Sequence, residues 1–342
     1  MSGIFSFIGI IISLSILIII HEAGHFLTGK WLGFYIKEFG FGYPPRLWGK
    51  KIKETIYSFN WIPFGGFIRF FDSRIDGDGG IGEEKSFGRQ KIWKRAVVMS
   101  AGILVNFVVG WMLISSVYMV GMPEGLLITQ VLKGSVAESN GIKSGDLIVD
   151  FGEVDGFIKF LDEQKGEEVV LNIKRQEKGF SIKFIPPIDE INGGRFGVFL
   201  SKTGIKRQGF LGSFIEGFKV SVLTVYYSVV GLIELIIKAF TNVGVLRGVV
   251  GPVGIATIAV ETSKLGFVYF IQIMALISLG LAAFNIFPIP GLDGGRLFMI
   301  LIEKIKGSPI AMKTEMYIFG SSFVFLLIVA LIITVKDIAA LF

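Results

Sequence analysis

The apolar run Ile4–Ile20 leads directly into the sequence His21-Glu22-Ala23-Gly24-His25. A helix over this run would be about 26 Å long at about 1.5 Å per residue, close to the bilayer hydrocarbon thickness of about 30 Å. Residues four apart share one face of a helix, so His21 and His25 can offer two imidazoles to one metal ion. They are the only two histidines in the chain of 342 residues. The stretch therefore predicts a membrane helix that carries part of a metal site.

Glu22 completes the pattern H-E-x-x-H, in which the glutamate is the usual general base for water activation. The alternative is a pair of ordinary helix histidines with satisfied hydrogen bonds. Ionisable residues at the end of a membrane-length run are costly and mark function by default, which favours the metal site. The chain contains no cysteine, so it has neither disulfides nor thiolate ligands. The third protein ligand of a zinc ion is therefore expected to be a carboxylate.

Composition places the chain among membrane proteins. Apolar residues make up 52% and charged residues 18%, and the mean hydropathy is +0.67. The net charge of +6 is interpreted as loop asymmetry rather than nucleic-acid binding, because no basic stretch alternates with stacking aromatics outside the apolar segments. No basic segment precedes Ile4–Ile20 and no small-residue cleavage site follows it. We therefore expect this run to stay in the mature chain.

The pattern predicts a polytopic α-helical membrane protein with four transmembrane helices, a membrane-associated β-hairpin-like segment and an inserted α+β domain. The predicted spans are residues 4–20, 96–121, 266–287 and 316–335. The predicted regions are a first membrane half (1–121), the inserted domain (122–202), interfacial amphipathic helices (203–262) and a second membrane half (263–342).

Charge bias predicts the topology. Residues 34–95 carry 12 Lys and Arg against 7 Asp and Glu, so this loop is expected in the cytoplasm and both termini outside. Val220–Ile233 is uncharged but only fourteen residues long, which suits an interfacial helix better than a span. Residues 247–256 contain three glycines and one proline and are expected to break any helix.

Asp293 is the predicted third ligand. The span 266–287 runs into a stretch interrupted by Pro288, Pro290 and Gly291, and irregular backbone at membrane depth is expected only where it lines a cavity. The alternative is an ordinary capping aspartate. With four spans, Asp293 reaches the same side as the histidines. If residues 220–240 also crossed, it would lie about 30 Å away on the other face.

Three further features carry expectations, and two of them have open alternatives. Residues 38–66 are rich in aromatics and glycine, which indicates short strands folding back toward the membrane, with an interfacial loop as the alternative. Asp72–Glu84 is rich in Gly and Asp and is expected to form a flexible surface segment. Asn106 lies inside the second span, where it either packs helices together or lines the catalytic cavity.

Residues 122–202 alternate apolar and polar positions between turn signals. The expected strands are Leu126–Val131, Leu147–Phe151, Val169–Lys174, Phe180–Phe184 and Phe196–Leu200. With a short helix opening at Ser135 and a Gly145-Asp146 turn, the region resembles a bacterial PDZ domain. Such domains bind peptide ends by strand addition, although a purely structural role is an equal alternative. After two spans, this domain is expected outside the cytoplasm.

Together these motifs resemble the site-2 protease family, and within it the bacterial regulators of sigma-E protease in a single-PDZ form. The motifs that carry the resemblance are His21-Glu22-Ala23-Gly24-His25, Gly40-Phe41-Gly42, Ile62-Pro63-Phe64-Gly65-Gly66, Ala101-Gly102 with Asn106-Phe107, Gly251-Pro252, Asn285, and Pro288, Pro290 and Leu292-Asp293-Gly294. Many members have proline where this chain has Ile103, and some regulators of sigma-E protease carry two PDZ domains.

The resemblance implies an intramembrane zinc endopeptidase. His21, His25 and Asp293 would hold Zn²⁺, and Glu22 would act as the general base. Asn285 would hydrogen-bond the substrate backbone. The segment holding Phe59, Asn60, Gly65 and Gly66 would offer an edge strand to an unwound substrate helix.

The resemblance also implies the partners. Substrates would be single-span proteins already trimmed outside the membrane by another protease, typically anti-sigma factors, and leftover signal peptides. The PDZ-like domain and residues 210–240 would exclude untrimmed proteins by size. The location would be the bacterial inner membrane, with the active site near the cytoplasmic side.

Two other functions are compatible with parts of the sequence. A non-proteolytic membrane scaffold would display the PDZ-like domain and carry a structural or vestigial metal site, but such a site needs no adjacent Glu22. A transporter with broken helices would explain the Pro and Gly interruption, but not the histidine spacing, and no inverted repeat is visible.

Overall fold

The computed structural model describes residues 2–77, 83–175, 178–187, 196–241, 248–263 and 265–339. The chain divides into two compact units. The first, called the membrane unit below, comprises Met1–Trp111, Lys219–Thr257 and Met274–Phe342. The second, called the inserted unit, comprises Met112–Phe218 and Ile258–Ile273.

Within the described ranges, five helices are long and apolar enough to cross a membrane. They are α1 (Ser2–Trp31), α3 (Ile92–Val120), α6 (Phe210–Thr241), α8 (Phe267–Ile286) and α10 (Met312–Ala339). The four predicted spans fall in α1, α3, α8 and α10, and together these helices make the chain a multi-pass membrane protein. The added candidate is α6, which continues well beyond the uncharged Val220–Ile233. The charged residues that flank this stretch lie inside the helix and do not end it. Glu234, for example, pairs with Lys238 one turn later at 2.9 Å.

Helix α1 does not end at the histidines. It runs on to Trp31 and stops at Gly33, whose φ of +83° is the left-handed conformation that glycine favours. The Phe34 N–H then donates to the Gly29 carbonyl at 2.9 Å. The H-E-x-x-H motif therefore lies within the helix, where both flanking turns hold its side chains.

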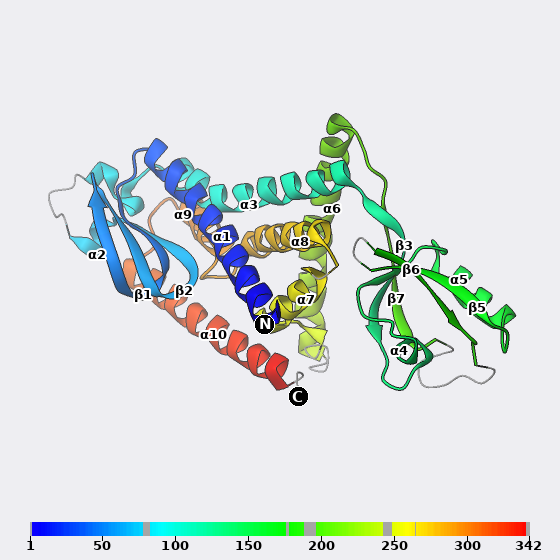
Figure 1. Ribbon diagram of the computed structural model, residues 1–342. Helices are drawn as coiled ribbons and strands as arrows, with labels where there is room; N and C mark the ends of the chain where they lie inside the picture. The colour runs from blue at the N-terminus through cyan, green and yellow to red at the C-terminus, as the bar shows by residue number, and fades with distance from the viewer. Residues whose placement is uncertain are drawn as a thin grey trace. The chain divides into compact units, whose positions relative to one another are not determined.

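Strands β1 (Ile36–Ile52) and β2 (Thr55–Phe70) form a sheet alongside α1 (Figure 1). The predicted strands in this segment are therefore present. Residues 46–52 pair with 55–60, while residues 38–41 are in register both with 56–59 and with 66–69. The segment 66–70 is therefore an edge of this sheet, and 56–59 is paired on both sides.

Asp72 starts the short helix α2 (Ser73–Asp76) by accepting a hydrogen bond from the Arg74 N–H at 3.1 Å. The expectation of a flexible segment over Asp72–Glu84 is therefore wrong at its start, where the structure has a helix capped by the Asp72 carboxylate. Residues 78–82 lie outside the described residues. Two 3₁₀ turns follow, η1 (Glu83–Lys85) and η2 (Phe87–Arg89).

Helix α7 (Pro252–Ser263) begins inside the stretch expected to break helices. Pro252 occupies the first helical position, where its missing N–H costs nothing. Near this start, Asp337 of α10 accepts a hydrogen bond from the Gly254 N–H at 2.8 Å. The predicted break is therefore wrong from residue 252 onward. Of the rest of that stretch, residue 247 lies outside the described part of the chain.

The inserted unit holds a five-stranded antiparallel sheet in the order β6-β5-β4-β3-β7. Its strands are β3 (Met122–Val131), β4 (Asp146–Ile148), β5 (Val169–Arg175), β6 (Lys178–Phe184) and β7 (Val198–Ile205), with helices α4 (Val136–Ser139) and α5 (Val154–Glu163). A strand is present in each expected segment, although β4 ends at Ile148 rather than Phe151 and β7 runs from Val198 to Ile205 rather than from Phe196 to Leu200. Ser135 caps α4 as predicted. Alternate burial of Val169, Leu171 and Ile173 builds the core against Phe157 and Leu161 of α5.

Candidate metal centre

Helices α1 and α3 approach closely because two glycines face the contact. A Cβ atom added at Gly24 would lie 2.9 Å from the Ala101 carbonyl oxygen, and one at Gly102 would lie 2.7 Å from His21 Nε2 and closer still to His25 Nε2. Real Cβ contacts are essentially never under 3.0 Å. The absence of a side chain at Gly102 is therefore what leaves room for both imidazoles.

Asp293 reaches the histidines through a folded turn. Helix α8 ends at Ile286, the chain turns over the next six residues, and Asp293 opens helix α9 (Asp293–Lys306). A Cβ atom at Gly294 would lie 2.6 Å from the Ile286 carbonyl carbon, and one at Gly295 would lie 2.7 Å from the Pro290 Cα. The two glycines thus let the start of α9 pack directly on the preceding turn.

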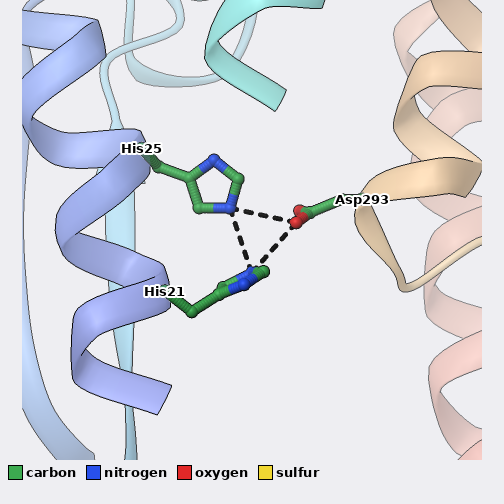
Figure 2. A group of neighbouring side chains, drawn as sticks. All are labelled: His21, His25 and Asp293. Carbon is green, nitrogen blue, oxygen red and sulfur yellow. Dashed lines mark hydrogen bonds and ion pairs between the residues drawn. The ribbon is translucent and has the colours of Figure 1, made fainter. Parts of the chain in front are cut away.

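The three predicted ligands converge (Figure 2). His21 and His25 project from one face of α1 toward Asp293, with their Nε2 atoms 3.2 Å apart. Asp293 Oδ2 lies 3.0 Å from each Nε2 atom. Both imidazoles are buried, at 7% and 4% exposure for the two residues. The sequence separation of 268 residues between His25 and Asp293 is thus closed by the tertiary fold.

Neighbouring groups hold both imidazole rings. His25 Nδ1 lies 2.7 Å from the Val98 carbonyl oxygen, which can only accept, so Nδ1 carries the proton and a neutral ring has its Nε2 lone pair facing Asp293. His21 Nδ1 lies 3.1 Å from the amide of Asn106, which is 1% exposed. Asn106 therefore contacts a metal-site ring, which favours the second of the two interpretations left open by the sequence.

The cluster fits a zinc ion. Two imidazole nitrogens and a carboxylate oxygen point their lone pairs at one another, an arrangement that repels unless a cation or proton lies between them. Ligands of tetrahedral zinc at about 2.0–2.2 Å lie about 3.3 Å from one another. The separations of 3.0–3.2 Å found here are slightly shorter than that. His21, His25 and Asp293 can therefore hold Zn²⁺ after a small expansion.

Asp293 serves the cluster as a carboxylate, because an aspartate binds a metal ion through an ionised oxygen. Glu22 is half-buried beside the cluster and makes no hydrogen bond to any residue in the described ranges. A free carboxylate next to three convergent ligands can accept and return a proton.

A buried ion pair ties α3 to α9. Arg95 Nη1 lies 2.5 Å from Glu303 Oε2, and both side chains are 5% exposed. The second carboxylate oxygen accepts from the Ile310 N–H at 3.2 Å. Because α9 begins at Asp293 and α3 contributes Gly102, this pair helps to hold the two walls of the metal site in register.

The predicted substrate residues occupy different positions. Asn285 is half-buried near the end of α8, and its amide makes no hydrogen bond to a residue that the structure describes. Gly66 lies at the edge strand beside α1, where a Cβ atom would be 3.6 Å from Glu22 Cγ, and one at Gly65 would be 3.4 Å from Ile18 Cγ2. Gly65 and Gly66 therefore lie against the turns of α1 that carry Ile18 and Glu22, and Asn285 lies eight residues before Asp293 in the chain.

Phe59 and Asn60 lie elsewhere in the sheet. Phe59 is 46% exposed and pairs with both Phe41 and Trp48, so its backbone is already engaged on both sides. Asn60 is 1% exposed, and its amide donates to the Phe41 and Gly42 carbonyls at 3.1 and 3.2 Å. Asn60 thus holds the shape of the sheet.

Sequence reasoning did not assign functions to Gly102, Val98 or Arg95. A glycine inside a long apolar helix is a weak hint of close packing, but nothing local indicates which side chain it accommodates. The Val98 carbonyl and the Arg95–Glu303 pair leave no local signal, because their partners lie 73 and 208 residues away.

Comparison with known proteins agrees with this geometry. The family model described as Peptidase family M50 matches residues 9–329. A protein of Clostridium perfringens whose name makes it a candidate zinc metalloprotease is 30% identical over 333 residues, covering 96% of this chain and 97% of that protein. A similarly named protein of Nostoc is 30% identical over 344 residues, covering 95% and 93%. The chloroplast membrane metalloprotease ARASP of Arabidopsis thaliana is 30% identical over 352 residues, covering 95% and 76%.

Proposed function

Because this chain belongs to peptidase family M50 and is a zinc metalloprotease, we propose that it cleaves peptide bonds of membrane-embedded substrates at the cluster of His21, His25 and Asp293. The single observation that carries the proposal is the convergence of these three ligands beside the unbonded carboxylate of Glu22, on a helix long and apolar enough to cross a membrane. Such a position brings the hydrolysis into the bilayer.

Each residue has a defined part in the reaction. His21, His25 and Asp293 would hold zinc, which would supply Lewis-acid polarisation of the carbonyl and activation of water. Glu22 takes the proton from the attacking water and passes it to the leaving amine. The Val98 carbonyl and the Asn106 amide keep the imidazoles of His25 and His21 oriented, as hydrogen-bond partners of metal ligands commonly do.

Substrate would be held as an extended strand. The backbone groups of a helix are already paired, so a transmembrane helix must open before its carbonyls reach the site. The edge at residues 66–70, with Gly66 next to Glu22, supports strand addition there. The free amide of Asn285 would bond the opposite side of the substrate backbone. Gly65 would allow close approach, while Phe59 and Asn60 would act by shaping the sheet.

The membrane topology is proposed to be four crossings through α1, α3, α8 and α10, with both termini outside and the metal site near the cytoplasmic side of a bacterial inner membrane. The 3.0 Å separations of Asp293 from His21 and His25 support an even count of crossings between them. A full crossing by α6 would send Asp293 to the opposite face, about 30 Å away. Helix α6 is therefore proposed to lie at the interface or to enter the membrane only in part.

The proposed substrates are single-span membrane proteins of the anti-sigma-factor kind, already trimmed by a first protease, and remnants of signal peptides. The inserted unit is proposed to be a PDZ domain outside the cytoplasm. Its sheet, with Ser135 capping α4, supports that assignment, and peptide ends would add at a sheet edge. Together with α6 it would exclude untrimmed proteins by size.

Co-expression with a tagged single-span substrate tests the proposal. The wild-type chain is expected to release the tagged fragment, and Glu22→Gln is expected to retain zinc but leave the substrate intact. Cleavage by Glu22→Gln would remove Glu22 as the base. A cleavage site mapped by mass spectrometry outside the substrate's apolar segment would contradict proteolysis within the membrane.

The zinc content of Asp293→Ala discriminates the enzyme from the non-proteolytic scaffold. In the enzyme, Asp293→Ala loses zinc and activity together. Unchanged zinc stoichiometry would exclude Asp293 from the site. A wild-type chain that binds zinc but cleaves none of a panel of membrane substrates would favour the scaffold.

A further inference from the structure

A groove away from the metal centre has the chemistry of a lipid site. It lies between the start of α3 and the face of α9 that carries Leu297, Leu301 and Lys304, and its volume is about 780 Å³. That volume falls within the range of about 300–1,000 Å³ common for small-ligand pockets. All its lining residues belong to the membrane unit.

The groove is an apolar trough with two positive charges. Lys91 and Lys304 are its only charged lining residues among those the structure describes, and the rest of the lining is hydrophobic. Trp93, Val97 and Leu301 line it with exposures of 55%, 40% and 50%. An occupant that satisfies both parts needs an anionic group and an apolar chain.

Neither lysine is neutralised by the protein. Both side chains are exposed, and neither ammonium forms an ion pair or hydrogen bond with a described residue. Glu303, which precedes Lys304 in the sequence, is 4% exposed and forms its ion pair with Arg95 at 2.5 Å. The groove therefore keeps an uncompensated positive charge where the start of α3 lies against α9.

We propose that this groove binds an anionic phospholipid, with the headgroup phosphate between Lys91 and Lys304 and an acyl chain along Trp93, Val97 and Leu301. Basic pockets between helices at the cytoplasmic boundary suit such headgroups, and tryptophan favours the same depth. A partner helix would cover the apolar wall but leave both lysines without a counter-charge.

The position of the site gives it a structural consequence. Ile300 of α9 lines the groove and belongs to the same buried cluster as Val98 of α3, whose carbonyl holds His25. Helix α9 also begins at Asp293. A lipid seated against both helices would thus brace the two sides of the metal centre. The binding itself does not depend on the proposed proteolysis, and its test does not use peptidase activity.

Tryptophan quenching by brominated lipids tests the proposal in the full chain. The protein is reconstituted in phosphatidylcholine vesicles that contain a minor fraction of either brominated phosphatidylglycerol or brominated phosphatidylcholine. The Trp93 signal is obtained as the difference from Trp93→Phe. We expect phosphatidylglycerol to quench Trp93 more strongly at equal mole fraction.

Charge and shape variants separate a site from a general surface effect. The double variant Lys91→Gln and Lys304→Gln is expected to lower the apparent affinity for the anionic lipid by about fivefold per lysine, about thirtyfold together. Lys50→Gln with Lys51→Gln, which removes the same charge from β1, is expected to keep the preference. Val97→Phe, which fills the trough, is expected to reduce quenching by both lipids.

Equal quenching of wild-type Trp93 by the two lipids would overturn the proposal. So would a preference that survives in the Lys91 and Lys304 variant, or one that disappears equally in the Lys50 and Lys51 control. Quenching by neither lipid, with dimers detected by cross-linking through the groove, would assign the surface to a second copy of the chain instead.

Discussion

Gly102 of α3 lies so close to His21 of α1 that a Cβ atom at position 102 would be 2.7 Å from His21 Nε2. The same Cβ atom would lie still closer to His25 Nε2. Gly102→Ala is therefore expected to displace an imidazole or separate the helices. The chain should lose most of its bound zinc, measured by elemental analysis, and its peptidase activity with it.

The matched control for this change is Gly280→Ala in α8, where an added Cβ meets nothing within 4 Å. Alanine is favoured over glycine in a helix by about 1 kcal/mol, so this variant should keep its zinc and its stability. Wild-type zinc content in Gly102→Ala would show that the helix crossing is looser than described.

Asn106 is expected to tune zinc affinity through His21. A zinc-binding Nε2 requires the proton on His21 Nδ1, and the Asn106 side chain can accept a hydrogen bond from that N–H group once its amide oxygen is turned toward the ring. Its Oδ1 is otherwise buried without a hydrogen-bond partner. Asn106→Leu should weaken zinc binding about 10–100-fold in competition with a chelator. Asn106→Asp should bind zinc at least as well as wild type, because a carboxylate accepts the same hydrogen bond.

A control for the Asn106 variants is Ser278→Ala. Ser278 Oγ donates to the Asn106 backbone carbonyl at 2.8 Å and leaves the amide untouched. This variant should keep its zinc affinity and the absorption spectrum of its cobalt-substituted form. If Asn106→Leu and Ser278→Ala weaken zinc binding equally, packing of α3 on α8 is responsible, rather than orientation of His21.

Breaking the Arg95–Glu303 pair should destabilise the membrane unit. Arg95→Met leaves the Glu303 carboxylate buried without its cation, which typically costs about 3–5 kcal/mol. The double variant with Glu303→Leu removes both charges and should recover most of the loss. Thermal unfolding in detergent measures both variants. Equal loss in the single and double variants would mean that the side-chain volumes matter, and the charges do not.

Asp72 should make stability depend on acid pH. Burial raises its pKa, but hydrogen bonds from Arg74 lower it further, so the folded pKa lies below the ordinary value. An unfolded aspartate titrates near 3.9. The stabilisation is therefore complete above that pH and is lost as pH falls through the folded pKa. The melting-temperature difference between wild type and Asp72→Asn should shrink as pH falls from neutral to 3. A constant difference would contradict this coupling.

Local pattern accounts for much of the fold. Runs of apolar residues predicted α1, α3, α8 and α10, because hydrophobic length is a property of the segment itself. Alternation predicted all five strands of the inserted unit and the cap at Ser135. The predictions failed at Asp72 and Pro252 because these turn-forming residues start helices here. The Arg74 N–H donates to Asp72 at the start of α2. The Gly254 N–H donates to Asp337 near the start of α7.

The sequence by itself determined which atoms are available to a metal. With two histidines four residues apart and no cysteine, a zinc ion has to take a carboxylate, and the interrupted helix before Asp293 indicated which one. These inferences need only residue types and helix periodicity.

The tertiary structure alone decided how those atoms are held. The space left by Gly102, the contact of Asn106 with His21, the Val98 carbonyl on His25 and the pairing of Arg95 with Glu303 are all made between helices. Contacts of this kind depend on where two helices cross and how each is rotated. Helix crossing is set by packing over the whole interface, and no local stretch of residues encodes it.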